Sequence, residues 1–218
     1  GQAGIDWMQF LQVADALIKL DPSNHIAYYR RGVAWGSVAE QTSDSQAAKK
    51  GSADFRKAID LDSDNVNYWG AWLMLLRRTA SMDSTLDVDA GFVEAFKANP
   101  KSAPLRLMYA DHLKRKDRAD EAEKQLRQAI ECEPKNPSGR IALARFFSET
   151  KQYDAAIKEL HAAEAVDPIH ADIYLLRSRI DRVTGKLKLA VKTLQKGLTA
   201  IEPNLTAIAA TQPVARKT

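Results

Sequence analysis

Three regularly spaced prolines constrain the fold of this chain most strongly. Pro100, Pro134 and Pro168 are evenly spaced, with an identical interval from each one to the next. A proline removes a backbone hydrogen-bond donor and clashes with the preceding helical turn, so each one marks the end of a helix. Pro137, which follows shortly after Pro134, suits the first turn of the next helix. The spacing therefore predicts a helical unit that recurs with a period of about 34 residues.

Each repeat has the apolar pattern of two amphipathic helices. In the second helix, small, large and small residues follow one another at positions i, i+4 and i+7. The three sets are Ala122, Leu126 and Ala129; Ala156, Leu160 and Ala163; and Ala190, Leu194 and Gly197. An earlier stripe recurs with the same period, at Tyr109, Ala110 and Leu113 and at Leu143, Ala144 and Phe147. Small residues let two antiparallel helices approach to about 8–10 Å. A single helix hairpin cannot cover its own apolar faces, so hairpins are expected to stack.

Three segments resemble the tetratricopeptide repeat, a helix–turn–helix unit of about 34 residues. They read LMYADHLKRKDRADEAEKQLRQAIECEP, IALARFFSETKQYDAAIKELHAAEAVDP and YLLRSRIDRVTGKLKLAVKTLQKGLTAIEP. They share the family's small residue in the first helix, its alanines in the second and its closing proline, with Ser178 at the small position of the last copy and Gly185 in its turn. The resemblance implies an all-α fold, a right-handed superhelical solenoid of antiparallel helix hairpins with a concave and a convex side.

The amino-terminal half follows the pattern with insertions. The interval from Pro22 to Ser63 is longer than the period of the prolines, and we place the excess in residues 40–52 as a polar extension between two helices. Leu73 stands where the family prefers a small residue, so we expect that hairpin to be less tightly packed. We predict an orphan second helix in residues 1–22, five helix pairs in 23–64, 65–101, 102–135, 136–169 and 170–203, and a cap with a basic tail in 204–218.

Composition sets limits on the class of protein. The chain has 218 residues, 45% hydrophobic and 28% charged, with no apolar run long enough to span a bilayer, so a soluble protein is expected. Cytoplasm and periplasm are equally compatible. The start at Gly1 indicates either a removed leader or an excerpt of a longer protein. Residues 1–100 hold 10 Lys and Arg against 13 Asp and Glu, and residues 101–218 hold 22 against 15. The basic second half favours an acidic partner.

No pattern typical of catalysis or metal binding is found. The four histidines do not recur in phase, Cys132 is the single cysteine, and glycine-rich phosphate loops are absent. Asp111 and His112 are neighbours on a predicted helix, where adjacent side chains point about 100° apart, so we expect a solvated pair. We therefore predict no catalytic residue, no cofactor and no metal.

A partner would be expected in the concave groove that the family resemblance implies. Phase places these residues beside the buried stripe of each first helix: Met74, Arg77, Leu107, Asp111, Lys114, Ile141, Arg145, Ser148, Leu175, Arg179 and Arg182. Because Arg145 and Arg179 are one repeat apart, they should occupy matching places on adjacent hairpins. The pattern predicts an apolar floor with arginines above it, suited to the carboxylates of an acidic peptide.

Three functions follow in order of preference. The first is a protein–protein interaction scaffold or adaptor that binds a protein or peptide partner, with the oligomeric state left open. The second is a helical-repeat protein that binds nucleic acid, suggested by the basic second half. Against it, residues 101–218 contain few aromatic side chains for base stacking. The third is a non-catalytic segment of a larger enzyme.

Overall fold

The structure is a computed structural model that describes residues 7–81 and 87–211, with side chains described to residue 203. These residues contain α-helices and no strand, which confirms the all-α fold class. They divide into two compact units, Gly1–Lys116 and Asp117–Thr218. The boundary between the units lies in the turn inside the predicted 102–135 repeat, and the predicted repeat boundaries stay a prediction.

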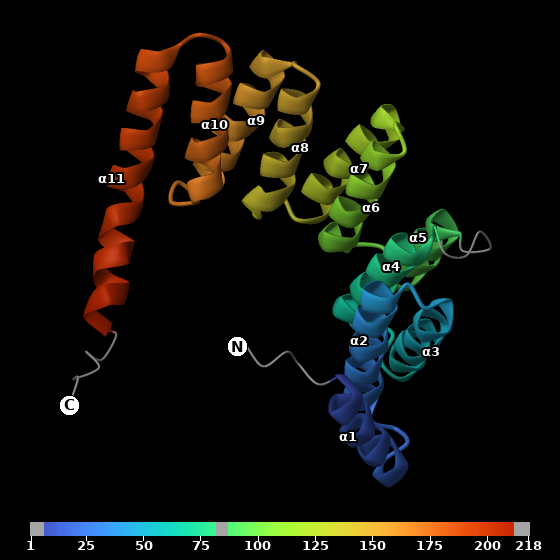
Figure 1. Ribbon diagram of the computed structural model, residues 1–218. Helices are drawn as coiled ribbons and strands as arrows, with labels where there is room; N and C mark the ends of the chain where they lie inside the picture. Colours follow the sequence, from blue (N-terminus) through green and yellow to red (C-terminus); the bar gives the residue numbers. More distant parts are fainter. Residues whose placement is uncertain (1–6, 82–86, 212–218) are drawn as a thin grey trace. The chain divides into compact units, whose positions relative to one another are not determined.

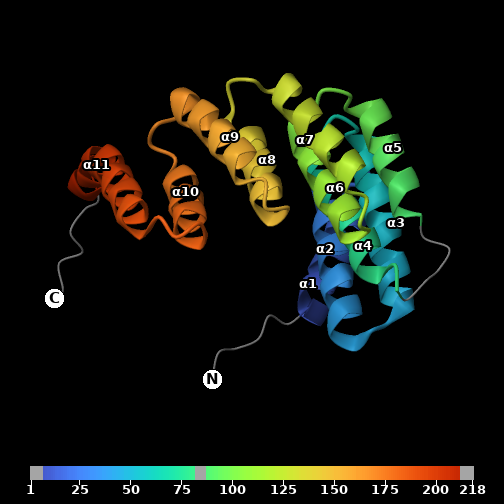
Figure 2. The ribbon, with the colours of Figure 1, turned by 90° about the horizontal axis from the view of Figure 1, so that it is seen from above.

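The first unit contains six helices among its described residues (Figure 1): α1 (Trp7–Leu20), α2 (His25–Thr42), α3 (Ser45–Leu61), α4 (Val66–Thr79), α5 (Val88–Ala98) and α6 (Ala103–Arg115). The second unit contains five: α7 (Ala119–Cys132), α8 (Pro137–Glu149), α9 (Tyr153–Val166), α10 (Ala171–Val183) and α11 (Leu187–Thr211). In both, successive helices pack as antiparallel pairs, as Figure 2 shows for α8 with α9 and for α10 with α11.

The junction between α7 and α8 shows how the prolines separate the helices. α7 ends at Cys132, and Pro134 follows directly after its carboxyl-terminal cap, Glu133. Asn136 then caps α8 by accepting a 3.0 Å hydrogen bond from the backbone N–H of Ser138. Pro137 is the first residue of α8, where its missing N–H costs nothing. The predicted helix-to-helix junction is confirmed.

The predicted small residues lie at the closest approach between paired helices. In the α8–α9 hairpin, Leu143 and Ala144 of α8 and Ala156, Leu160 and Ala163 of α9 are all fully buried. Because these side chains have no exposed surface, the hairpin core is made by the stripes that the sequence period identified.

The α2–α3 hairpin differs from the sequence-based prediction of a polar extension in residues 40–52. These residues instead lengthen both helices, so α2 has 18 residues and α3 has 17. The turn is short because Ser43 adopts a left-handed backbone conformation, φ 55°, and Asp44 caps α3 through the N–H of Gln46. The added turns are stabilised by a small apolar cluster in which Trp35 and Val38 pack against the buried residues Ala39, Ala47 and Ala48.

A network of ion pairs holds α1 against α2 and α3. Arg31 of α2 donates two hydrogen bonds to Asp54 of α3, at 2.8 and 2.6 Å, and a third, of 2.6 Å, to Asp15 of α1. The hydrogen bonds to Asp54 raise the pKa of Arg31 above its ordinary value against the opposing effect of burial, and Asp15 adds to the rise. α1, expected as a helix without a partner of its own, is thus tied into the first unit.

The last helix continues through the closing proline of its repeat. α11 runs from Leu187 to Thr211 with Pro203 inside it, whereas the sequence pattern predicted a repeat ending at residue 203. A proline deletes one helical hydrogen bond and bends the helix, but it does not have to end it. Residues 212–218 of the predicted basic tail lie outside the described residues.

Candidate functional site: the first-helix faces of the two units

The predicted groove residues fall on the first helices of consecutive hairpins, which pack side by side within each unit. We name them by unit. The α4–α6 face of the first unit consists of Met74, Arg77, Leu107, Asp111 and Lys114. The α8–α10 face of the second unit consists of Ile141, Arg145, Ser148, Leu175, Arg179 and Arg182. Because they belong to different units, each face is a separate candidate site.

On the α8–α10 face, the arginines differ in their ionic partners. Arg145 lies 3.8 Å from the carboxylate of Asp172, an ion pair between α8 and α10. Arg179 and Arg182 are exposed, and among the described residues neither has a carboxylate partner. These two guanidinium groups keep all of their donors available to a ligand.

The apolar part of the same face is formed mainly by α10. Leu175 lies one turn before Arg179 on the same stripe, and its side chain is 56% exposed. Val183, directly after Arg182, is also 56% exposed. Ile141, expected on the free stripe of α8, is buried instead, because it faces the packed core between the helices. The exposed apolar surface is therefore narrower than the sequence predicted.

On the α4–α6 face, Arg77 is paired with a carboxylate. Arg77 donates a 2.8 Å hydrogen bond to Asp111, one repeat further along the chain, and Arg115 donates one of 3.1 Å to the same carboxylate oxygen. Met74 is 42% exposed, whereas Leu107 and Lys114 are half-buried. This face therefore differs from the α8–α10 face, since its predicted arginine already has a carboxylate partner.

The first unit also contains a cavity of about 240 Å³ between α2 and α4 that the sequence analysis missed. Its lining is Tyr29, Val33, Gly36, Ser37, Glu40, Phe55, Ala71, Met74, Leu75 and Arg78. An ion pair between Arg78 and Glu40 lies at its polar side. The interval from Val33 to Met74 equals the lengthened interval from Pro22 to Ser63, so allowing for the insertion would have placed Val33 on the groove stripe.

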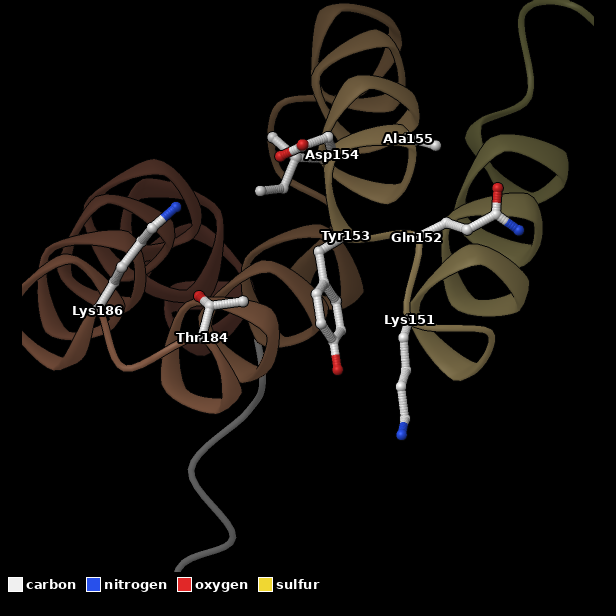
Figure 3. A pocket seen from close by; sticks show the side chains of 8 residues that line it. Lys151, Gln152, Tyr153, Asp154, Ala155, Thr184 and Lys186 are labelled. Carbon is white, nitrogen blue, oxygen red and sulfur yellow. The ribbon is translucent and has the colours of Figure 1, made fainter.

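A shallow depression of about 320 Å³ lies at the hairpin turns of the second unit. Figure 3 shows Lys151 and Tyr153 pointing in one direction and Lys186 in another. The hydroxyl of Thr184 donates to the backbone carbonyl of Ile180 at 2.9 Å and is not aimed into the hollow. Because the polar ends of these side chains do not converge, the depression does not have the geometry of a ligand-binding site.

A cluster around Glu164 fixes α10 to its neighbours. Glu164 of α9 forms an ion pair with Lys196 of α11, accepts a 3.3 Å hydrogen bond from the Tyr174 hydroxyl and lies 3.8 Å from Arg177. Burial raises the pKa of Glu164, but Lys196, Tyr174 and Arg177 together lower it more, so the net pKa lies below its ordinary value. Burial, followed by the charge of Glu164, raises the pKa of Tyr174. The cluster braces the helix that carries Arg179 and Arg182.

The prediction that Asp111 and His112 form a solvated pair is wrong for His112. Its side chain is buried and packs against the rings of Phe92 and Tyr109. Its Nε2 atom lies 3.6 Å from Oδ1 of Asp89 on α5. The imidazole therefore belongs to the core of the α5–α6 hairpin. The described residues contain no group of three side chains suited to a metal ion, and no described helix is both long and apolar enough to cross a membrane.

The sequence model of the tetratricopeptide repeat family matches residues 92–146 and 117–180. Residues 92–180 therefore carry tetratricopeptide repeats. Proteins with tetratricopeptide repeats generally mediate protein–protein interactions.

Known proteins resemble this chain in sequence or in fold. The chain is 26% identical over 191 residues to anaphase-promoting complex subunit 3 of Schizosaccharomyces pombe, covering 84% of this chain and 26% of that protein. Yeast Tom70 superposes with a TM-score of 0.67 at 22% identity, over 92% of this chain and 42% of Tom70. YrrB, described as a tetratricopeptide-repeat protein with an unusual peptide-binding site, superposes with a TM-score of 0.50 at 18% identity, over 90% and 96%. The chain thus spans about a quarter of its curated relative.

Proposed function

We propose that this chain is a non-catalytic interaction scaffold, and that the α8–α10 face binds an acidic peptide segment of a partner protein. The observation that carries the proposal is the stripe on α10. Arg179 and Arg182 are exposed and lack a carboxylate partner among the described residues, and exposed Leu175 lies beside them. The face therefore offers two guanidinium groups next to an apolar side chain.

The chemistry of the stripe suits carboxylates with an adjacent apolar group. A guanidinium binds a carboxylate through two parallel N–H donors, and this arrangement is stronger than a neutral hydrogen bond. Arg179 and Arg182 are at positions i and i+3 of one helix, so their head groups are neighbours on the surface. Leu175 supplies apolar contact one turn away, which gives the site a second, salt-insensitive component.

The second candidate, nucleic-acid binding, has less support. Base stacking needs exposed aromatic side chains, and in the described part of the second unit Phe146, Phe147 and Tyr174 are buried while Tyr153 is half-buried. The free arginines could contact phosphates, but such contacts alone give binding without sequence discrimination. A peptide explains the apolar neighbour of the arginines and a phosphate backbone does not.

The comparisons support the class of partner. YrrB is described as a protein with an unusual peptide-binding site, and the fission yeast relative is a subunit of the anaphase-promoting complex. Because this chain spans only part of the fission yeast protein, we carry over from these relatives a role in protein–protein contact, without any particular partner.

A peptide library displayed on phage tests the proposal. The full chain should select peptides with two or more Asp or Glu residues close to Leu, Ile or Phe. Raising the salt concentration should weaken the selected peptides but leave part of their affinity, because the apolar contact is not screened. Selection of purely acidic sequences would contradict the proposal. So would a higher affinity for single-stranded nucleic acid than for the selected peptides, with a steep salt dependence.

A further inference from the structure

An apolar stripe on α11 has no partner among the described residues. Its members are exposed despite being large hydrophobic residues: Leu187 at 62%, Val191 at 55%, Leu194 at 44% and Leu198 at 63%. Their successive separations alternate between i+4 and i+3, which is the spacing of a coiled-coil seam. Half-buried Ile201 continues the alternation, and Leu205 and Ile208 extend it in the sequence.

The stripe lies beside the surface that α11 uses within its own hairpin, and Leu194, which the repeat pattern placed with Ala190 and Gly197, is 44% exposed and belongs to the outer stripe. Toward α10, α11 presents Ala190, Thr193 and Gly197, which are buried, and Gly197 lies directly against the ring of Tyr174. α11 also has 25 residues and α10 only 13, so α11 runs roughly 18 Å further. Figure 1 shows this extension beyond the end of α10. The seam therefore continues where the hairpin offers no cover.

We propose that the stripe pairs with the same stripe of a second copy of this chain, in an antiparallel two-helix contact. A contact of a surface with itself about a twofold axis is closed, so it gives a dimer and no larger species. The proposal is independent of the α8–α10 face and of the peptide that we assign to it.

The charges that flank the stripe determine the direction of pairing. Lys188, Gln195 and Glu202 recur at heptad spacing and lie along one edge of the seam. In an antiparallel pair with Gln195 near the twofold axis, each Lys188 faces Glu202 of the second copy, giving two opposite-charge contacts. A parallel pair would place Lys188 and Glu202 opposite small or neutral residues, Ala190, Gly197 and Asn204. Charge complementarity therefore favours the antiparallel arrangement.

The same register gives well-matched layers inside the seam. Val191 would pack against Ile201 of the second copy, and Leu194 against Leu198, with each layer repeated by the twofold axis. Pro203 falls on the side of α11 opposite the seam, so its ring does not enter the contact. Burying these exposed and partly exposed apolar side chains is the driving force.

Sedimentation equilibrium of the full chain tests the dimer. The wild-type chain should show a concentration-dependent monomer–dimer equilibrium below about 100 µM. The double variant Leu194→Glu/Leu198→Glu should be monomeric, because it would place four carboxylates in the seam. Leu189→Glu is the matched control, since Leu189 is also 40% exposed on α11 but lies on the opposite side from the stripe. It should dimerise like the wild type, with equal helical content in all three proteins.

The direction of pairing is tested by charge exchange. Lys188→Glu alone and Glu202→Lys alone should each weaken the dimer about five- to thirty-fold at low salt. The variant with both changes should recover the wild-type dissociation constant, because it restores opposite charges across the contact.

Three results would overturn the proposal. One is a wild-type chain that stays monomeric up to about 100 µM. A second is a ladder of species larger than a dimer, which would indicate that the stripe binds another surface, such as the exposed Met8, Val13 and Leu17 of α1. The third is a double charge exchange that fails to restore the dimer lost in the single variants.

Discussion

Thr193 Oγ1 donates a 2.9 Å hydrogen bond to Oδ2 of Asp181, and both side chains are buried between α10 and α11. One repeat earlier, the place of Asp181 is taken by Phe147, an apolar core residue. The last hairpin therefore contains a buried polar pair where its neighbour has an aromatic ring.

The first prediction concerns this pair. Thr193→Val removes the hydroxyl but keeps the shape of the side chain, so the Asp181 carboxylate loses its donor while it stays buried. The free energy of unfolding, measured in urea, should fall by about 1–3 kcal/mol. Thr199→Val on the same helix is the control, because Thr199 is exposed and bonds only to a carbonyl of its own helix. It should change the free energy by less than about 0.5 kcal/mol.

If Asp181 and Thr193 act as a unit, replacing both should be milder than replacing Thr193 alone. The double variant Asp181→Leu/Thr193→Val should recover most of the lost stability, since an apolar pair leaves no unsatisfied buried group. Equal losses in the single and double variants would show that the hydrogen bond is not the reason for the loss.

The second prediction concerns the closest approach of α10 and α11. A Cβ at Gly197 would lie 2.5 Å from Cγ of Tyr174, too close unless the two helices move apart. Gly197→Ala should lower the free energy of unfolding by about 1–3 kcal/mol. At Gly70 of α4, the nearest atom to an added Cβ is the Met108 sulfur at 3.4 Å, an ordinary contact. Gly70→Ala should therefore leave stability unchanged or raise it by up to about 1 kcal/mol, because alanine favours helix.

The third prediction concerns the effect of pH through Glu164. Its folded pKa lies below the ordinary value of 4.5, so the cluster stabilises the fold above that pH and loses the contribution as pH falls through the folded pKa. Glu164→Gln should be less stable than the wild type by about 1 kcal/mol at neutral pH. The difference between the two proteins should shrink as pH falls below 4.5. A difference that is constant with pH in urea denaturation would contradict an ionic origin.

The period of the prolines and the small-residue stripes was enough to predict the class of fold. What it could not predict was how individual hairpins accommodate exceptions. Leu73 occupies a small-residue position and is still buried, because Gly91 on the facing helix makes room for it. Residues 40–52 looked like a polar extension, yet Ala39, Ala47 and Ala48 gave two longer helices a core of their own.

For the candidate site, the helical repeat of the sequence identified which residues lie beside the buried stripe. It did not identify the ionic partners of those residues. Arg77 and Arg182 occupy equivalent positions in the pattern, and only the structure shows that Asp111 neutralises Arg77. Pairing between helices depends on side-chain rotamers and on the distance between hairpins, and neither can be read from the spacing of residues along the chain.

The fourth prediction follows from that difference. Asp111→Ser removes the carboxylate that accepts hydrogen bonds from Arg77 and Arg115, so the α4–α6 face should become more cationic and Arg77 should lose its carboxylate partner. The variant should bind acidic peptides several-fold more tightly than the wild type, while the loss of a partly exposed ion pair costs less than about 1 kcal/mol of stability. Calorimetric titration with a selected peptide measures the first effect and urea denaturation the second. Unchanged peptide affinity would show that a free arginine is not sufficient for capture.

Charge reversal on α10 tests whether Arg179 and Arg182 bind the acidic peptide. The chain carrying Arg179→Glu/Arg182→Glu should be titrated with a selected acidic peptide, in parallel with the chain carrying Lys158→Glu/Lys192→Glu. The second variant has the same change in net charge, but its exposed lysines lie on α9 and α11. The arginine variant should lose at least about tenfold in affinity, while the lysine variant should stay within about twofold of the wild type. Equal losses in both, or no loss in the arginine variant, would contradict the proposal.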